Sequence, residues 1–134
     1  MSERIFIIED DANLLYGLQS RFSSEGYEVE TSMGEEDGPE LLSLIKRGKF
    51  DYLVLDVILP KHDGFNLIEE IRSDETIADT PIFIFTDLSE ADGKARSEEL
   101  GINYYFVKSD FDVNEFADKV VRIISNKEKM EEME

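Results

Sequence analysis

Three carboxylates, a hydroxyl and an ammonium group each stand directly after a short apolar run of the sequence. They are Glu9 and Asp10, Asp56, Thr86 and Lys108. Carboxylates that are crowded together repel one another, and a hard cation that prefers oxygen ligands, such as Mg²⁺, reconciles them best. A carboxylate can also attack phosphorus to form an acyl phosphate, whose oxygens an ammonium and a hydroxyl would stabilise. The set therefore predicts phosphoryl transfer.

These side chains suit different roles in such a reaction. Asp56 stands alone after a central apolar run, which makes it the best candidate nucleophile. Glu9 and Asp10 are adjacent and are better suited to holding a metal ion. Thr86 and Lys108 would contact the phosphoryl oxygens. An isolated Asp after a strand is commonly only a turn or capping residue, so the prediction depends on the whole constellation.

The apolar runs that precede these residues predict a parallel sheet. They occupy residues 5–8, 52–55, 82–85 and 104–107, and each is apolar throughout. Continuous runs of β-branched and aromatic residues fit strands that are buried on both faces. Residues 27–31 alternate between apolar and acidic side chains, as expected of an edge strand. The carboxyl ends of parallel strands share one edge of the sheet, where open α/β folds bind ligands.

Apolar residues recur with helical period after each strand, over residues 14–22, 41–45, 67–71, 89–100 and 116–124. Asp11 is expected to cap the first helix, and the spacing of Asp112 and Glu115 predicts a capping box for the last. The fourth segment offers mainly Ala91 and Ala95 and contains Gly93, so we expect the weakest packing there. Alternating strands and helices predict a doubly wound α/β fold.

Length and composition bound the remaining possibilities. The 134 residues predict one domain with its core over about 4–125, followed by a charged tail at 126–134 that frays. The net charge of −18 disfavours direct binding to nucleic acid or to anionic membranes. The chain has no cysteine, which excludes disulfides and thiolate chemistry, and the first residues do not resemble a signal peptide. We therefore expect a cytoplasmic protein. Its one histidine, His62, is expected to be exposed and not catalytic.

Four motifs together resemble the CheY-like receiver domain of response regulators in two-component signalling. They are Ile-Ile-Glu-Asp-Asp at 7–11, Leu-Val-Leu-Asp-Val-Ile-Leu-Pro-Lys-His-Asp-Gly at 53–64, Ile-Phe-Ile-Phe-Thr at 82–86 and Tyr-Phe-Val-Lys at 105–108. The resemblance extends from about Arg4 to Ile124. It implies a flavodoxin-like, five-stranded parallel sheet of order 2-1-3-4-5 that is flanked by five helices.

The resemblance also implies a role for each matching residue. Asp56 would be the phosphoacceptor, with Mg²⁺ held by Glu9, Asp10, Asp56 and the backbone carbonyl of Ile58. Thr86 and Lys108 would bind the phosphoryl group, and Thr86 and Tyr105 would act as the switch. The implied phosphodonor is a sensor histidine kinase or a histidine phosphotransfer protein, and the downstream protein target is unknown. The face from the fourth to the fifth helix would be the dimer surface.

Two positions depart from the usual family pattern. Ser109 stands where the family usually has proline, and Asp87 stands where it prefers a small residue.

Three other functions compete with a receiver domain. A phosphatase with an aspartyl-phosphate intermediate usually carries a second Asp two positions after the nucleophile, but Ile58 is there. A flavin-type binder would need phosphate-binding loops rich in Gly, Ser or Thr, which are missing. A degenerate receiver is disfavoured because the acceptor site is intact.

Overall fold

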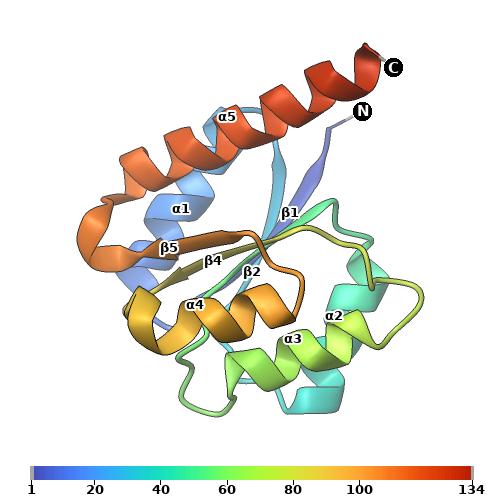
Figure 1. Ribbon diagram of the computed structural model, residues 1–134, viewed down its shortest axis with the longest axis vertical. Helices are drawn as coiled ribbons and strands as arrows, with labels where there is room; N and C mark the ends of the chain where they lie inside the picture. The colour runs from blue at the N-terminus through green and yellow to red at the C-terminus, as the bar shows by residue number, and fades with distance from the viewer. Residues whose placement is uncertain (1, 134) are drawn as a thin grey trace.

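A five-stranded parallel sheet forms the centre of the computed structural model, which describes residues 2–133. The strand order is β2-β1-β3-β4-β5, and helices cover both faces of the sheet (Figure 1). The order along the chain is β1 (Arg4–Ile8), α1 (Ala12–Ser24), β2 (Glu28–Ser32), α2 (Gly38–Gly48), β3 (Tyr52–Leu55), α3 (Gly64–Arg72), β4 (Ile82–Thr86), α4 (Glu90–Glu99), β5 (Tyr104–Val107), the 3₁₀ turn η1 (Lys108–Asp110) and α5 (Val113–Glu132). The predicted doubly wound α/β fold is confirmed.

Two hydrophobic layers hold the helices against the sheet. On one face α1 and α5 cover side chains of β1, β3 and β4, and Phe85 and Phe116 stack with ring centroids 4.0 Å apart. On the other face α2 and α3 cover a second cluster, with α4 at its margin (Figure 1). The three central strands are buried throughout, apart from Arg4. Strand β2 alternates between exposed and half-buried residues until Ser32, as predicted for an edge strand.

The register of the strands brings their carboxyl ends level. Ile8 pairs with both Ser32 and Leu55, and Leu55 pairs with Ile84. Thr86 pairs with Val107 on the neighbouring strand. The residues that follow these pairs therefore emerge at one edge of the sheet, where the sequence places its reactive side chains.

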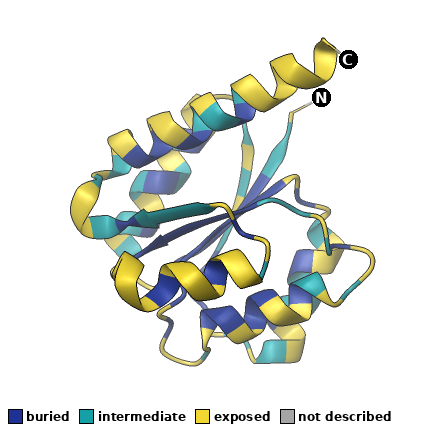
Figure 2. Ribbon diagram, viewed as in Figure 1, coloured by how far each residue is buried: buried dark blue, intermediate teal, exposed yellow. Residues whose placement is uncertain are grey.

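Helix α4 differs in detail from its prediction. Ser89 caps it, as its side chain accepts a hydrogen bond from the Asp92 amide. Ala91 and Ala95 are exposed, whereas the buried positions are Gly93 and Ser97. Figure 2 shows that most of this helix is exposed. The two alanines were therefore the wrong contact face, because the helix is rotated so that Gly93 and Ser97 are the buried positions.

The tail at 126–134, which is expected to fray, is helical as far as Glu132, and residue 134 lies outside the described residues. Helix α5 continues without a break through Glu132 and projects beyond the sheet (Figure 1). Residues 126–132 are exposed, but Lys, Glu and Met favour helix and no Gly or Pro interrupts them. Surface charge therefore does not end this helix. Within residues 2–133, no helix is both long and apolar enough to cross a membrane.

Candidate functional site

The carboxyl edge of the sheet brings Glu9, Asp10 and Asp56 together. Each offers a carboxylate oxygen, and these oxygens lie within 4.8 Å of one another. Glu9 and Asp56 are buried, with 2% and 4% of their surfaces exposed, whereas Asp10 faces solvent. Three carboxylates at this spacing form a donor set that fits a hard divalent cation. The acidic cluster predicted from the sequence is therefore present and could hold a metal ion.

Lys108 lies between the two buried carboxylates. Its Nζ is 2.6 Å from Asp56 Oδ2 and 2.8 Å from Glu9 Oε1. Burial favours the neutral amine, but hydrogen bonds to Asp56 and Glu9 outweigh this, so the pKa of Lys108 lies above its ordinary value. The ammonium remains charged and partly compensates the cluster. Lys108 begins η1, so Ser109 follows it in a short 3₁₀ turn.

Backbone amides orient the carboxylates. The amide of Asp11 donates to Glu9 Oε2 at 3.1 Å, and the amide of Ile58 donates to Asp56 Oδ1 at 2.9 Å. Burial nevertheless raises the pKa of Glu9 to about 7, although the bonds from Lys108 and Asp11 oppose the shift. A bound cation would favour the ionised form of Glu9 and would take the place of a proton. Asp11 itself caps α1, as predicted, because its side chain accepts from the Leu14 amide.

The loop between β3 and α3 carries Ile58 past this cluster and is closely held. Ile58 forms an isolated bridge with Asp63, which caps α3 by accepting from the Phe65 amide. At Gly64 a Cβ atom would lie 2.4 Å from Val57 Cα, so the loop and helix can approach only because glycine is there. The Ile58 side chain is 51% exposed, which leaves its backbone as the part near the site.

The same loop is tied to the loop between β2 and α2. His62 Nε2 donates to the Glu36 carbonyl at 2.6 Å, and Lys61 Nζ donates to the Glu35 carbonyl at 3.0 Å. His62 is therefore half-buried and holds a loop, and the prediction that it is exposed was wrong. Its polar neighbours in the sequence gave no sign of this contact, because the partner is a backbone carbonyl 26 positions away.

Thr86 and Tyr105 meet at the backbone of Leu88. Thr86 is fully buried, and its hydroxyl accepts from the Leu88 amide at 3.3 Å. The Tyr105 hydroxyl donates to the Leu88 carbonyl at 2.8 Å. Burial, with help from the charge of Asp56, raises the pKa of Tyr105 to about 12, so the hydroxyl stays protonated and can donate. One loop residue thus connects the two predicted switch residues.

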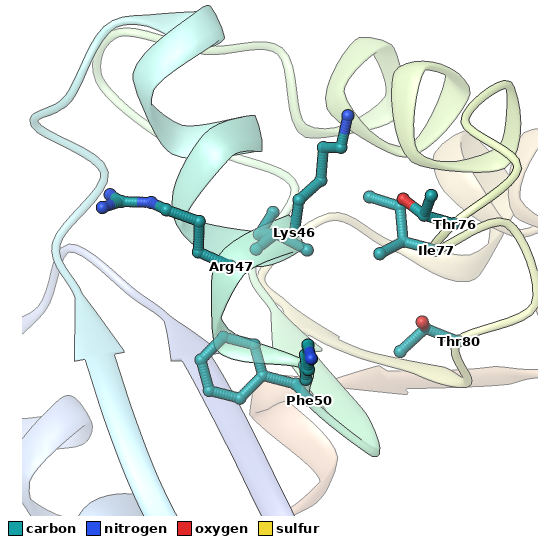
Figure 3. A pocket seen from close by; sticks show the side chains of 8 residues that line it. Lys46, Arg47, Phe50, Thr76, Ile77 and Thr80 are labelled. Carbon is teal, nitrogen blue, oxygen red and sulfur yellow. The ribbon is translucent and has the colours of Figure 1, made fainter.

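A pocket of about 560 Å³ lies at the opposite edge of the sheet, between the end of α2 and the loop before β4. Figure 3 shows Lys46 and Arg47 on one side of it and Thr76 and Thr80 on the other. Lys46 is paired with Asp74 at 2.9 Å. The lining includes no carboxylate, so the acidic donor set lies elsewhere and this pocket is not part of the candidate site.

Comparison with known proteins agrees with this fold. A family model described as "Response regulator receiver domain" matches residues 5–121. The chain therefore belongs to the response regulator receiver domain family, the signalling domains of two-component systems. The receiver domain of HemR from Leptospira biflexa, in its non-phosphorylated form, has a TM-score of 0.79 and is 32% identical, and the match covers 92% of this chain and 95% of that one.

Two curated relatives are longer regulators. The chain is 37% identical over 106 residues to the "Probable transcriptional regulator ycf27" of Porphyridium aerugineum, a match that covers 79% of this chain and 42% of that protein. It is 33% identical over 118 residues to the response regulator PleD of Caulobacter vibrioides, which covers 87% of this chain and 25% of PleD. The chain thus spans less than half the length of either relative.

Proposed function

We propose that this receiver domain accepts a phosphoryl group on Asp56. The observation that carries the proposal is the pairing of Lys108 with Asp56 and Glu9, beside Asp10, at the carboxyl edge of the sheet. Asp56 Oδ1 is engaged by the Ile58 amide, so Oδ2 is the oxygen that can attack. Lys108 holds that oxygen now and can follow the negative charge onto the phosphoryl oxygens as they arrive.

The donor we propose is the phosphohistidine of a sensor histidine kinase or of a histidine phosphotransfer protein. The new bond joins Asp56 Oδ2 to phosphorus while the bond between phosphorus and the donor nitrogen breaks. The donor imidazole leaves neutral, with its remaining proton on the other ring nitrogen. The products are an acyl phosphate and a free histidine, so no further reactant is needed.

We propose Mg²⁺ as the cofactor, held by Glu9, Asp10, Asp56 and the Ile58 carbonyl. The oxygen donors and the crowding of negative charge fit this ion. When bound, Mg²⁺ supplies positive charge that lowers the repulsion between the carboxylates and the incoming phosphate. Thr86 contributes a buried hydroxyl that can donate to a phosphoryl oxygen once it turns from the Leu88 amide.

A phosphatase remains the disfavoured alternative. Such an enzyme would need a general acid close to the acyl phosphate, and the side chain two positions after Asp56 is the hydrocarbon of Ile58. We therefore propose a signalling role that acts through protein contacts. By the family resemblance we also propose a histidine kinase as partner, a downstream protein target and a dimer formed through the α4-to-α5 face. The cytoplasmic location is proposed from the sequence composition and its first residues. The acidic surface supports the absence of direct binding to nucleic acid or membranes by this part of the protein.

The test is phosphorylation by acetyl phosphate in the presence of Mg²⁺, followed by intact mass spectrometry. The protein should gain one phosphate, and Asp56→Asn should gain none. Asp79→Asn is the matched control, because Asp79 is an exposed carboxylate before β4 and should leave the gain unchanged. Chelation of the metal should prevent the reaction. The same gain on Asp56→Asn would refute the assignment.

A further inference from the structure

Gly93 occupies an unusual place for a glycine, in the interior of α4 and buried. Its φ angle is not positive, so the backbone does not require glycine there. Glycine in a helix interior is less favourable than alanine, because it loses more conformational freedom on folding. A contact with another part of the protein therefore explains why position 93 has no side chain.

The Tyr105 hydroxyl occupies the space where that side chain would be. A Cβ atom at position 93 would lie 2.1 Å from Tyr105 Oη and 2.9 Å from Tyr105 Cζ, both too close for any real structure. It would also lie 2.8 Å from Leu88 Cδ2, a flexible side-chain end that can turn away. The hydroxyl is less free to move, since it donates to the Leu88 carbonyl at 2.8 Å.

We propose that Gly93 is a positioning residue that sets the orientation of Tyr105. The absent side chain leaves room for the Tyr105 hydroxyl between α4 and the Leu88 carbonyl, so that the ring bridges β5, α4 and the loop after Thr86. A side chain at position 93 would displace the ring and release the Leu88 backbone. Only the further role of Tyr105 as a switch depends on the proposed function.

The test uses two opposing effects of Gly93→Ala on thermal unfolding. Alanine favours helix, but its methyl group displaces Tyr105 and breaks the bond to Leu88. Gly93→Ala should therefore lower Tm in the parent protein and raise it in a Tyr105→Ala background, where the space is free. Folding of the double variant but not of Gly93→Ala alone gives the same answer. A shift of the same sign and size in both backgrounds, or failure to fold in both, would overturn the proposal.

Gly17 provides a matched control within α1. A Cβ atom there would lie 3.5 Å and 3.6 Å from the Val113 methyl groups, which are ordinary contacts. Gly17→Ala should raise Tm by the same amount whether or not Tyr105 is present. Dependence of this control on Tyr105 would also count against the proposal, because the effect would then not be specific to position 93.

A second measurement reports the ring itself. With 3-fluorotyrosine incorporated, the ¹⁹F resonance of Tyr105 can be assigned through its loss in Tyr105→Phe. Gly93→Ala should shift this resonance and Gly17→Ala should not; an unchanged resonance in Gly93→Ala would contradict the proposal. Beryllofluoride with Mg²⁺, added to the parent, should move the resonance in the same direction. If beryllofluoride has no effect while the unfolding result holds, the phosphoacceptor proposal fails and the positioning role stands.

Discussion

Helices α4 and α5 both adjoin the edge strand β5, but different forces hold them. Helix α5 buries Phe116, Ala117, Val120 and Ile124. Phe116 stacks on Phe85 and also meets the edge of Phe106 at a centroid distance of 5.3 Å. A capping box fixes the start of the helix, with Asp112 and Glu115 each accepting from the other's backbone amide. Packing and capping together therefore anchor α5 firmly to the sheet.

Helix α4 has little hydrocarbon in contact with the sheet. Its buried positions are Gly93 and Ser97, and the Ser97 hydroxyl donates within the helix to the Lys94 carbonyl. Arg96 reaches α3, where it bonds to Glu69 at 3.1 Å and lies over the Phe65 ring. Surface ion pairs of this kind contribute little free energy. The Tyr105 hydroxyl bond at Leu88 therefore acts together with the Ser89 cap in holding the start of α4.

The difference indicates which helix can respond to the site. Thr86 and Tyr105 both bond to Leu88, which precedes α4, whereas α5 is fixed by aromatic packing on the opposite face. A change at Asp56 that draws the Thr86 hydroxyl away from the Leu88 amide would loosen the loop before α4. Elements that move in regulation are drawn from the less stable parts of a fold. We therefore expect α4 to respond to phosphorylation and α5 to stay in place.

The largest expected effect is the loss of stability when a buried side chain of α5, compared with one of α4, is removed. Phe116→Ala should lower the free energy of unfolding by about 3–5 kcal/mol, because it empties a stacked aromatic site. Ser97→Ala, at a buried position of α4, should change it by less than about 1 kcal/mol, because its hydroxyl bonds only within its own helix. Urea unfolding measures both. Comparable losses in the two variants would show that α4 is anchored as firmly as α5.

The second-largest effect should be a difference between α4 and α5 in their response to a ligand at the acceptor site. Beryllofluoride with Mg²⁺ should change amide hydrogen exchange in residues 88–97 by up to about tenfold, because the Leu88 amide loses its hydrogen bond to the Thr86 hydroxyl. Amides of residues 116–124 should change only by the uniform stabilisation that any bound ligand gives. Asp56→Asn is the control that should remove both changes. An equal local response in α5 would break the distinction between the helices.

The smallest effect lies where the last turns of α5 meet the N-terminal segment. Glu3 lies beside Glu128, and burial first, with the interaction with Glu128 second, raises the pKa of Glu3 from 4.5 to about 7. The folded protein therefore holds this proton to higher pH than the unfolded chain does. The stability it contributes is present below pH 4.5 and is lost as the pH rises to about 7.

Glu3→Gln should flatten this part of the pH profile. Thermal unfolding at pH 4.5 and pH 7.5 measures the difference, and Glu75→Gln, an exposed carboxyl in the loop before β4, is the control. The change should be modest, because water screens partly exposed carboxyls. A profile as steep in Glu3→Gln as in the parent would place the titration elsewhere.

Sequence alone was enough to predict the fold class and the location of the reactive side chains. Both follow from short-range patterns: strands buried on two faces require continuous apolar runs, and the residues after parallel strands must share an edge. Glu9, Asp56 and Lys108 each follow such a run, so their proximity could be expected before their contacts were known. The capping residues Asp11 and Asp112 were predictable for the same reason, because their bonds span only three positions.

Only the tertiary structure decided contacts between distant segments. His62 bonds to a carbonyl 26 positions away, and Gly93 is explained by the hydroxyl of Tyr105 on another element. The last turns of α5 lie beside the N-terminal segment, where Glu128 faces Glu3 at the other end of the chain. No residue pattern encodes these pairings. Any donor can bond to a backbone carbonyl, and any side chain of suitable size can occupy the space beside a glycine. The packed chain selects one partner for each, since its sheet order fixes which segments lie side by side.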